Sequence, residues 1–492
     1  MKYELLQFRN VCMVEDDRRL LSGLNFQVFA GEIVGLIGLN DTGKSALVKL
    51  LMGEAEPTGG TILLENREYG AASVAQARQA GIYYVMRNST MVDSLSVVEN
   101  LCLMNGAVAG RRIFRRKSQG EYVSEILEKY GLGGLCKKSV LSLTPTEKYL
   151  LEIVKAGMNG GKLIILSDLF YVFDHEDSHT ELIALCRKLK QEKISFMVIG
   201  NRFNSTLSVA DRIIMLSRGR VARTLYQGGF NREEFDNYLF GNERFRRNAV
   251  RCRPDRVGEE CFSIRGLRIT DEQTLDVKAH CGEVLGVYDD GVLGDLICRL
   301  LFYGADLADG VYVNRKPVAA RDYWNVFQAG IGLVPDQCND VLFLDQDALG
   351  NMSVRCYDKA CSHAGVISGR VMRYLLNEHK GKLEGIDLTC NASMLSYRQR
   401  FRLMMEMHKL VNWKIVVVKD PSLNYDPIET QAIYDYMNEM RENGLAVILI
   451  TSDISELLSI CNRGVIRDKQ GHIKEIEEFS EIIEKNFLNM EL

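Results

Sequence analysis

The stretch that decides the fold is Gly38-Leu39-Asn40-Asp41-Thr42-Gly43-Lys44-Ser45, which fits the pattern G-x-x-x-x-G-K-[ST]. It follows an apolar run, Ile33 to Ile37, that predicts a strand, and it opens a segment with Leu47 and Leu50 on one helical face. Between a strand and a helix, such a loop points backbone N–H groups at phosphates, its lysine reaches the β- and γ-phosphates, and its serine ligates Mg²⁺. We therefore predict a phosphate-binding loop.

The same frame recurs 251 residues later, where Gly31-Glu32-Ile33 returns as Gly282-Glu283-Val284. The second loop reads Asp289-Asp290-Gly291-Val292-Leu293-Gly294-Asp295-Leu296, so the lysine position carries Asp295. A carboxylate about 4 Å from a phosphate costs on the order of 4 kcal/mol at an effective dielectric near 20. We expect this second loop to bind no nucleotide.

Composition limits the classes of protein that fit. A chain of 492 residues predicts two to four domains, and a net charge of −4 favours neither nucleic acid nor an anionic membrane as a partner. Thirteen cysteines without a C-x-x-C pair suit a reducing cytosol. Neither a signal peptide nor an apolar stretch of about 18 residues is present, so we expect a cytoplasmic protein that does not span a bilayer.

Apolar runs alternate with helical patterns along both halves, which predicts an α/β fold with parallel sheets. In the first half the expected strands are 82–86, 163–166 and 196–199, and Thr144-Pro145-Thr146-Glu147 begins a helix. In the second half Ser396-Tyr397-Arg398-Gln399 begins the corresponding helix, and 415–418 and 447–450 are strands. Charged residues without apolar periodicity predict the boundary, giving domains at 1–243 and 259–492 with a linker at 244–258.

This order and spacing of motifs resembles the tandem ATP-binding-cassette (ABC) subunits of bacterial carbohydrate importers of the ribose, galactose and arabinose group. The resemblance covers nearly the whole chain. It implies two P-loop ABC domains, each with a RecA-like parallel core, an antiparallel β-subdomain and a helical subdomain. It also implies that the two halves pair head to tail as a pseudo-dimer, and that the subunit docks on permeases at the inner face of the membrane.

The resemblance further implies ATP and Mg²⁺ as cofactors and assigns the site residues. Nucleotide-binding residues are then those of the first loop and of the second signature segment: Gly38, Asn40, Asp41, Thr42, Gly43, Lys44, Ser45, Ala46, Ser396 and Arg398. The metal would be held by Ser45 and Asp168, and Asp168 is also the candidate catalytic residue.

Several positions depart from the family's pattern. The Walker B aspartate corresponds to Ser167, the catalytic glutamate to Asp168, the Q-loop glutamine to Arg87 and the switch histidine to Asn201. In the second half, Walker B reads Lys419-Asp420. Glu15 stands where an adenine-stacking aromatic is expected, and only the D-loop aspartates, Asp174 and Asp426, keep their spacing.

The signature segments keep their helix starts but lose the glycines that let backbone N–H groups approach a γ-phosphate. Thr146 occupies one such position, and Tyr397 and Arg398 occupy the others. One interpretation is retention of the fold after loss of catalysis. The alternative is that Arg398 or Arg400 contacts the phosphate held by Lys44, with a guanidinium replacing backbone donors.

Two functions remain open at this point. The first is an ATP-binding importer subunit with one usable site and weak or no hydrolysis. The second is a cytosolic pseudo-ATPase that acts as a nucleotide sensor or scaffold. A general base contributes about 10²–10⁴-fold to a rate, so the altered positions predict that ATP binding outlasts hydrolysis.

Overall fold

The computed structural model describes residues 3–15, 18–86, 89–102, 116–167, 176–200, 209–226, 258–270, 273–288, 292–320, 322–335, 337–355, 368–379, 381, 383, 385–453, 456–457, 460–461, 463–467 and 473–476. By its internal contacts the chain divides into two compact units, Met1–Phe245 and Arg246–Leu492. The predicted linker at 244–258 lies almost entirely outside the described residues, so the exact boundaries stay a prediction.

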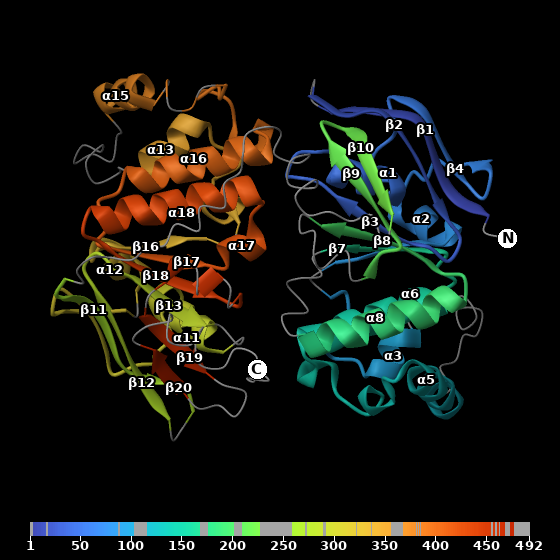
Figure 1. The fold of residues 1–492 in the computed structure, drawn as a ribbon, viewed down its shortest axis with the longest axis horizontal. Helices are drawn as coiled ribbons and strands as arrows, with labels where there is room; N and C mark the ends of the chain where they lie inside the picture. Colours follow the sequence, from blue (N-terminus) through green and yellow to red (C-terminus); the bar gives the residue numbers. More distant parts are fainter. Residues whose placement is uncertain are drawn as a thin grey trace. The chain divides into compact units, whose positions relative to one another are not determined.

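The first unit contains two sheets (Figure 1). A four-stranded antiparallel sheet has the order β2-β1-β4-β5, formed by Arg18–Phe29, Glu4–Glu15, Gly59–Leu64 and Arg67–Glu68. A six-stranded sheet has the order β10-β9-β3-β8-β7-β6, formed by Arg220–Tyr226, Arg212–Ser217, Ile33–Ile37, Ser195–Gly200, Leu163–Ser167 and Ile82–Val85. All its pairs are parallel except β10 with β9. The predicted strands are confirmed within one residue at each end.

Helices cover both faces of the six-stranded sheet. The covering helices are α1 (Lys44–Met52), α2 (Val74–Ala80), α6 (Pro145–Met158) and α8 (Glu176–Gln191). Two further helices, α3 (Val97–Cys102) and α5 (Arg116–Tyr130), pack beyond α6, with the short 3₁₀ turns η1 (Gly133–Leu135) and η2 (Val140–Ser142). Alternate strand residues enter different cores: Ile164 and Leu166 pack with α6 and α8, whereas Leu163 and Ile165 pack with α1 and the antiparallel sheet. Burial on both faces explains why these strands read as continuous apolar runs.

The second unit repeats this plan. Its antiparallel sheet has the order β12-β11-β14-β15, formed by Thr274–His280, Glu260–Arg268, Gly310–Val313 and Lys316–Val318. Its six-stranded sheet has the order β16-β17-β18-β13-β19-β20, formed by Ile331–Val334, Ile415–Lys419, Ala446–Thr451, Val284–Tyr288, Arg463–Arg467 and Ile473–Ile476. All its pairs are parallel except β19 with β20. The strand order matches that of the first unit position by position, so the sequence repeat is a repeat of fold.

The helices of the second unit are α11 (Leu293–Phe302), α12 (Tyr323–Gln328), α13 (Ala348–Arg355), α15 (Gly369–His379), α16 (Tyr397–Lys409), α17 (Pro421–Asn424) and α18 (Pro427–Glu442), with 3₁₀ turns η3 (Cys338–Val341) and η4 (Ala392–Met394). The two-domain α/β architecture is therefore confirmed. Among the described residues, no helix is long and apolar enough to cross a membrane.

Both predicted capping boxes form. Thr144 Oγ1 accepts a hydrogen bond from Glu147 N (3.1 Å), and the Glu147 carboxylate accepts one from Thr144 N (2.9 Å). Ser396 and Gln399 make the same exchange at the start of α16. These side chains satisfy backbone donors that an unfinished helix end would leave unpaired, so the helix starts are fixed by local sequence.

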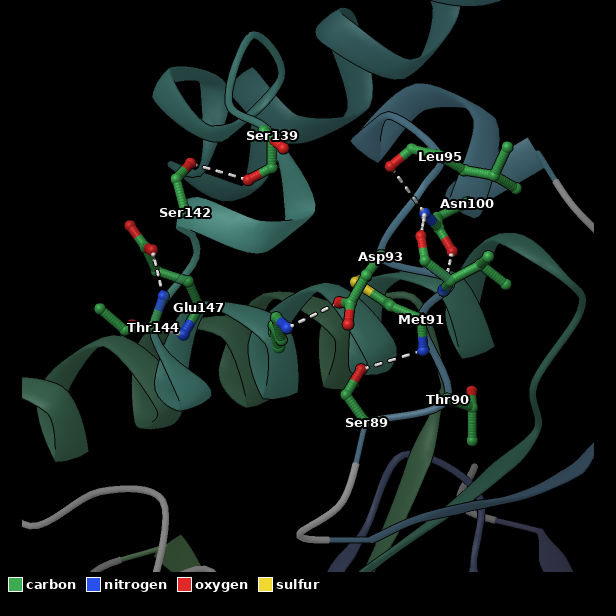
Figure 2. A network of polar contacts seen from close by, with 12 residues as sticks. Ser89, Thr90, Met91, Asp93, Leu95, Asn100, Ser139, Ser142, Thr144 and Glu147 are labelled. Carbon is green, nitrogen blue, oxygen red and sulfur yellow. Dashed lines mark hydrogen bonds and ion pairs between the residues drawn. The ribbon is translucent and has the colours of Figure 1, made fainter. Parts of the chain in front are cut away.

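A buried asparagine holds the same turn in each unit. Asn100 Oδ1 accepts from Val92 N (2.8 Å), and its Nδ2 donates to three carbonyls, those of Val92, Leu95 and Ser96. Figure 2 shows the Asn100 side chain turned toward the backbone at Leu95. In the second unit Asn351 makes the equivalent bonds to Phe343, Gln346 and Asp347.

We predict that Asn100→Ala lowers the free energy of unfolding of the first unit by about 2–4 kcal/mol, because several buried backbone groups lose their partner. Urea unfolding followed by circular dichroism measures the change. Ser142→Ala, which removes one exposed hydrogen bond to Ser139 O (2.8 Å), is the control and should cost less than about 1 kcal/mol. Equal costs for the two variants would contradict the assignment.

Candidate functional site

The loop at residues 38–45 connects β3 to α1, as predicted, and its backbone requires glycine at two positions. Gly43 has φ +103°, and a Cβ there would lie 2.8 Å from Leu20 O and 2.7 Å from Leu21 Cδ2. Gly38 does not have a left-handed backbone, but a Cβ there would lie 2.7 Å from Leu216 O. Any side chain at either position would force the loop away from its neighbours.

Polar contacts from three segments hold this loop. Thr42 Oγ1 donates to Leu39 O within the loop (2.7 Å), and Gly219 N, in the turn between β9 and β10, donates to Thr42 O (3.1 Å). Gly219 O in turn accepts from Ser22 N on β2 (2.9 Å). The loop therefore keeps its shape through contacts made by distant parts of the first unit.

Lys44 and Ser45 stand at the first turn of α1. Lys44 Nζ donates to Gly38 O (2.5 Å) and Leu39 O (2.6 Å), which places the ammonium against the loop backbone. Ser45 is exposed, Ala46 is buried beneath it, and no described side chain caps the helix. A cation beside an uncapped helix N-terminus attracts anions, so the loop is suited to bind phosphates.

The residues present fit a nucleotide phosphate better than they fit a fully ligated metal. Ser45 supplies an exposed hydroxyl oxygen, the ligand type that Mg²⁺ accepts. Ser167, at the carboxyl end of β7, offers a neutral hydroxyl that is hydrogen-bonded to Tyr84 OH (3.0 Å), and its carbonyl accepts from Tyr149 OH (2.8 Å). The candidate Asp168 lies outside the described residues, as do Arg87, Asp174 and Asn201.

The second loop has changed its backbone as well as its charge. Helix α11 begins at Leu293, the counterpart of Thr42, so Gly294 lies within the helix and lacks the left-handed conformation of Gly43. Asp295, the counterpart of Lys44, sits in the first turn, with its carboxylate 3.7 Å from the Arg299 guanidinium. A carboxylate there interacts favourably with the helix dipole and repels a phosphate. Asp289 and Asp290 lie outside the described residues.

The Walker B region of the second unit is used for internal contacts. Asp420 follows β17, is buried, and adopts a left-handed backbone with φ 43°. Its Oδ1 accepts from Ser452 N (2.9 Å) and Ser452 Oγ (3.3 Å), at the end of the neighbouring strand β18. A non-glycine residue in this conformation costs free energy, which these two hydrogen bonds help to offset.

A buried glutamate that the sequence reasoning missed lies at the same edge of the sheet. Glu456 accepts hydrogen bonds from the hydroxyls of Ser422 (3.0 Å), Thr451 and Tyr434. Burial raises the pKa of Glu456 to about 7, although the three hydroxyl bonds oppose that rise. The sequence signal for this cluster is weak, because only Thr451 is close to Glu456 in the chain, whereas Ser422 and Tyr434 precede it by 34 and 22 residues.

The signature segment of the second unit places its polar groups within its own unit. Ser396 is occupied by the capping box, and an Arg398 amino group lies 3.8 Å from the Asp426 carboxylate. Arg400 donates to Asn339 Oδ1 (2.9 Å) and Leu395 O (3.0 Å). Asp426 itself caps α18 by accepting from Ile428 N and Glu429 N, so its retention has a structural cause. Contact of Ser396, Arg398 or Arg400 with a nucleotide stays a prediction.

The sequence is similar to those of known ATP-binding proteins. Residues 21–169 match the family model described as ABC transporter. The chain is 25% identical to the ribose import ATP-binding protein of Geobacillus kaustophilus, with 91% of each chain covered, and 26% identical to the xylose import ATP-binding protein of the same organism, with 94% of each covered. It is 26% identical to the arabinose import ATP-binding protein of Paraburkholderia xenovorans, over 95% of this chain and 91% of that one.

Among solved structures, the ADP conformation of an ATP-binding cassette of an ABC transporter covers 49% of this chain and 96% of its own, at 21% identity and a TM-score of 0.42. The sequence relatives extend over both units of the chain. The resemblance to tandem ABC subunits of carbohydrate importers, inferred above from the motifs, is thus confirmed over nearly the whole length.

We predict that Glu456→Gln changes how stability depends on pH. With a pKa of about 7 in the folded state, against 4.5 as the reference, the native state holds an extra proton between these values, so wild-type stability falls as pH rises through this window. The variant lacks that loss and should gain about 2–3 kcal/mol relative to the wild type between pH 5 and pH 8. Urea unfolding at both pH values measures this. For the control Glu259→Gln, at an exposed position, the free energy of unfolding should change with pH as it does in the wild type. The same pH dependence for Glu456→Gln would contradict the prediction.

Proposed function

We propose that the chain is the ATP-binding subunit of a carbohydrate importer, that it holds one ATP at residues 38–45, and that it hydrolyses ATP slowly or not at all. The observation that carries the proposal is the contrast between the two loops. Lys44 lies in a loop whose glycines and hydrogen bonds leave room for phosphates. Its counterpart Asp295 is an anion within α11, a helix that begins two residues earlier than α1 does. The ribose, xylose and arabinose import proteins among the relatives support the class of cargo.

The residues have distinct roles in this proposal. The backbone of the loop and Lys44 hold the phosphates, and the exposed hydroxyl of Ser45 supplies an oxygen to Mg²⁺, which when bound neutralises phosphate charge. Asp168 is the remaining carboxylate for the metal or for a water molecule. Ser396 and Arg398 are proposed to complete the site from the second unit, in a pseudo-dimer of the two halves docked on permease subunits at the inner face of the membrane.

A cytosolic pseudo-ATPase that senses nucleotide or acts as a scaffold is the second candidate. It is favoured by the neutral Ser167–Tyr84 pair and by the internal Asp420–Ser452 bonds, which leave both sheet edges poor in free carboxylates among the described residues. The two candidates differ in location. Co-expression with the permease subunits of a carbohydrate importer should bring an importer subunit into the membrane fraction and leave a scaffold in the soluble fraction.

For the binding step, we predict that calorimetry with Mg-ATP gives one site per chain and that Lys44→Ala removes it, because the loop then lacks its cation. Lys162→Ala, which removes an exposed ion pair with Glu65 (2.6 Å), serves as the matched control and should bind normally. Undiminished binding by Lys44→Ala, or two sites per chain, would refute the assignment of the site.

For the chemical step, we predict very low steady-state ATPase activity, because Ser167, Asp168 and Asn201 hold metal and water poorly. Combining Ser167→Asp, Asp168→Glu and Asn201→His should raise turnover by about 100-fold or more. Activity counts only if Lys44→Ala abolishes it, since contaminating ATPases mimic a weak signal. Wild-type turnover equal to that of the restored variant would show that other residues perform the chemistry. An inert variant that still binds ATP would direct the next changes to Tyr397→Gly and Arg398→Gly.

A further inference from the structure

Two cysteines of the second unit lie on the same face of the β11–β12 hairpin. The pairing register advances by two residues on β11, across Cys261, and by one residue on β12, from His280 to Ala279, so Cys261 is the extra residue of a bulge. A bulge changes the direction of the side chains beside it, and Cys261 and its neighbour Phe262 are both buried in the same hydrophobic core. Cys281, directly after β12, packs against that core.

The two thiols are neighbours within this core. Cys281 N donates to Glu259 O on β11 (3.0 Å), which holds Cys281 beside the start of that strand. Burial raises the pKa of the Cys261 thiol, and a side-chain hydrogen bond with Cys281 and the charge of Glu283 raise it further. Both cysteines are free thiols in the structure. The hairpin therefore holds a dithiol whose members are 20 residues apart in the chain.

The first unit has the same bulge without thiols. β1 and β2 show the same shift of register, and Ala30 N donates to Tyr3 O (2.9 Å) as Cys281 N does to its partner in the second unit. Ala30 therefore corresponds to Cys281. Leu5, the residue in the bulge of β1, corresponds to Cys261, and it packs with Ala30 in an apolar core. The bulge forms without sulfur, so the fold does not explain why the second unit has a cysteine at both positions.

We propose that Cys261 and Cys281 are a modification site, at which a hydroperoxide produces a reversible disulfide that stabilises the second unit. The site is separate from nucleotide binding at residues 38–45, because both cysteines belong to the second unit. It is also consistent with a reducing cytosol, where disulfides are mostly transient and respond to oxidants.

The difference in exposure sets the order of the chemical steps. Cys281 is half-buried and Cys261 is 5% exposed, so an oxidant from solvent reaches Cys281 first. The hydroperoxide transfers one oxygen atom to the Cys281 sulfur, its O–O bond breaks, and it leaves as water or an alcohol, which gives a sulfenic acid. The Cys261 sulfur then attacks the sulfenic sulfur. The S–S bond forms, and the hydroxyl leaves with the Cys261 proton as water.

The disulfide would join β11 to a turn that contacts the six-stranded sheet. Gly282 N donates to Leu445 O, just before β18 (3.1 Å), and the Glu283 carboxylate lies 2.8 Å from the Arg463 guanidinium on β19. A cross-link that closes a loop of about 20 residues restricts the unfolded chain and so stabilises the folded one.

The test treats the full chain with hydrogen peroxide, removes the peroxide with catalase, alkylates the remaining thiols with N-ethylmaleimide and maps peptides without reductant. The expected product is a peptide containing Cys261 linked to one containing Cys281, which dithiothreitol separates. Recovery of Cys281 as an alkylated thiol or as a sulfinic acid, with no such linked product, would overturn the proposal.

Unfolding in urea measures the stabilisation. Both tryptophans of the chain, Trp324 and Trp413, lie in the second unit, so their fluorescence reports its unfolding. With N-ethylmaleimide present to stop thiol exchange, oxidation should raise the urea midpoint by on the order of 1 M, and dithiothreitol should reverse the shift. A linked product with an unchanged midpoint would overturn the stabilising role.

Two variants test the assignment of the thiols. Cys281→Ala introduces the residue that the first unit has at this place, and it should lose both the linked product and the shift of the midpoint. Cys298→Ala removes a buried thiol of α11 that lies in the same tryptic peptide as Cys281, and it should keep both. An oxidant-induced shift that persists in Cys281→Ala, or is lost in Cys298→Ala, would contradict the assignment, and the peptide map of the unmodified chain decides the matter if either variant fails to fold.

Discussion

The contact between Gly43 and the β1–β2 hairpin is the constraint on which the first site depends. A left-handed residue packed against Leu20 O and Leu21 allows the chain to leave β3, turn through the loop and enter α1 with Lys44 at its start. The β9–β10 turn contacts the same place through Gly219. In the second unit the equivalent glycine has joined the helix, and the loop geometry is lost together with the lysine. In the second loop, both the backbone conformation and the charge are therefore less suited to an anion than in the first loop.

Local patterns were enough to predict much of this fold. Apolar runs predicted β3, β7, β8, β17 and β18 because both faces of these strands are buried, and the S/T-x-x-E/Q pattern predicted two helix starts because the capping bonds lie within four residues. The extension of α11 was not predicted, since the aspartates suggested repulsion without a change of backbone. The Glu456 cluster was not predicted either, because Ser422, Tyr434 and Thr451 meet only through the tertiary fold.

Several residues at positions associated with catalysis have structural contacts that explain their presence without catalysis. Asp426 caps α18, Gln399 caps α16, and Asp420 anchors Ser452 across two strands. Each satisfies buried or terminal backbone donors, and loss of such a bond costs about 1–3 kcal/mol. Conservation of spacing between the two halves is therefore expected from folding alone. The first loop differs, because Lys44 stands beside the exposed Ser45 at a helix N-terminus that no described side chain caps, so its charge faces a place where an anion could bind.

The single ATP site with slow hydrolysis that we propose would have a thermodynamic consequence. A ligand that binds only the folded first unit stabilises that unit by about 2.7 kcal/mol when it is present at 100 times its dissociation constant. Under our proposal the second loop adds no such term. The free energy available for a conformational change is then set by how fully nucleotide occupies the first loop. When hydrolysis is slow, this occupancy follows the nucleotide concentration. An importer subunit must instead release its nucleotide after each transport cycle. The rate of hydrolysis at this loop therefore decides whether the chain can drive transport or only sense the nucleotide concentration.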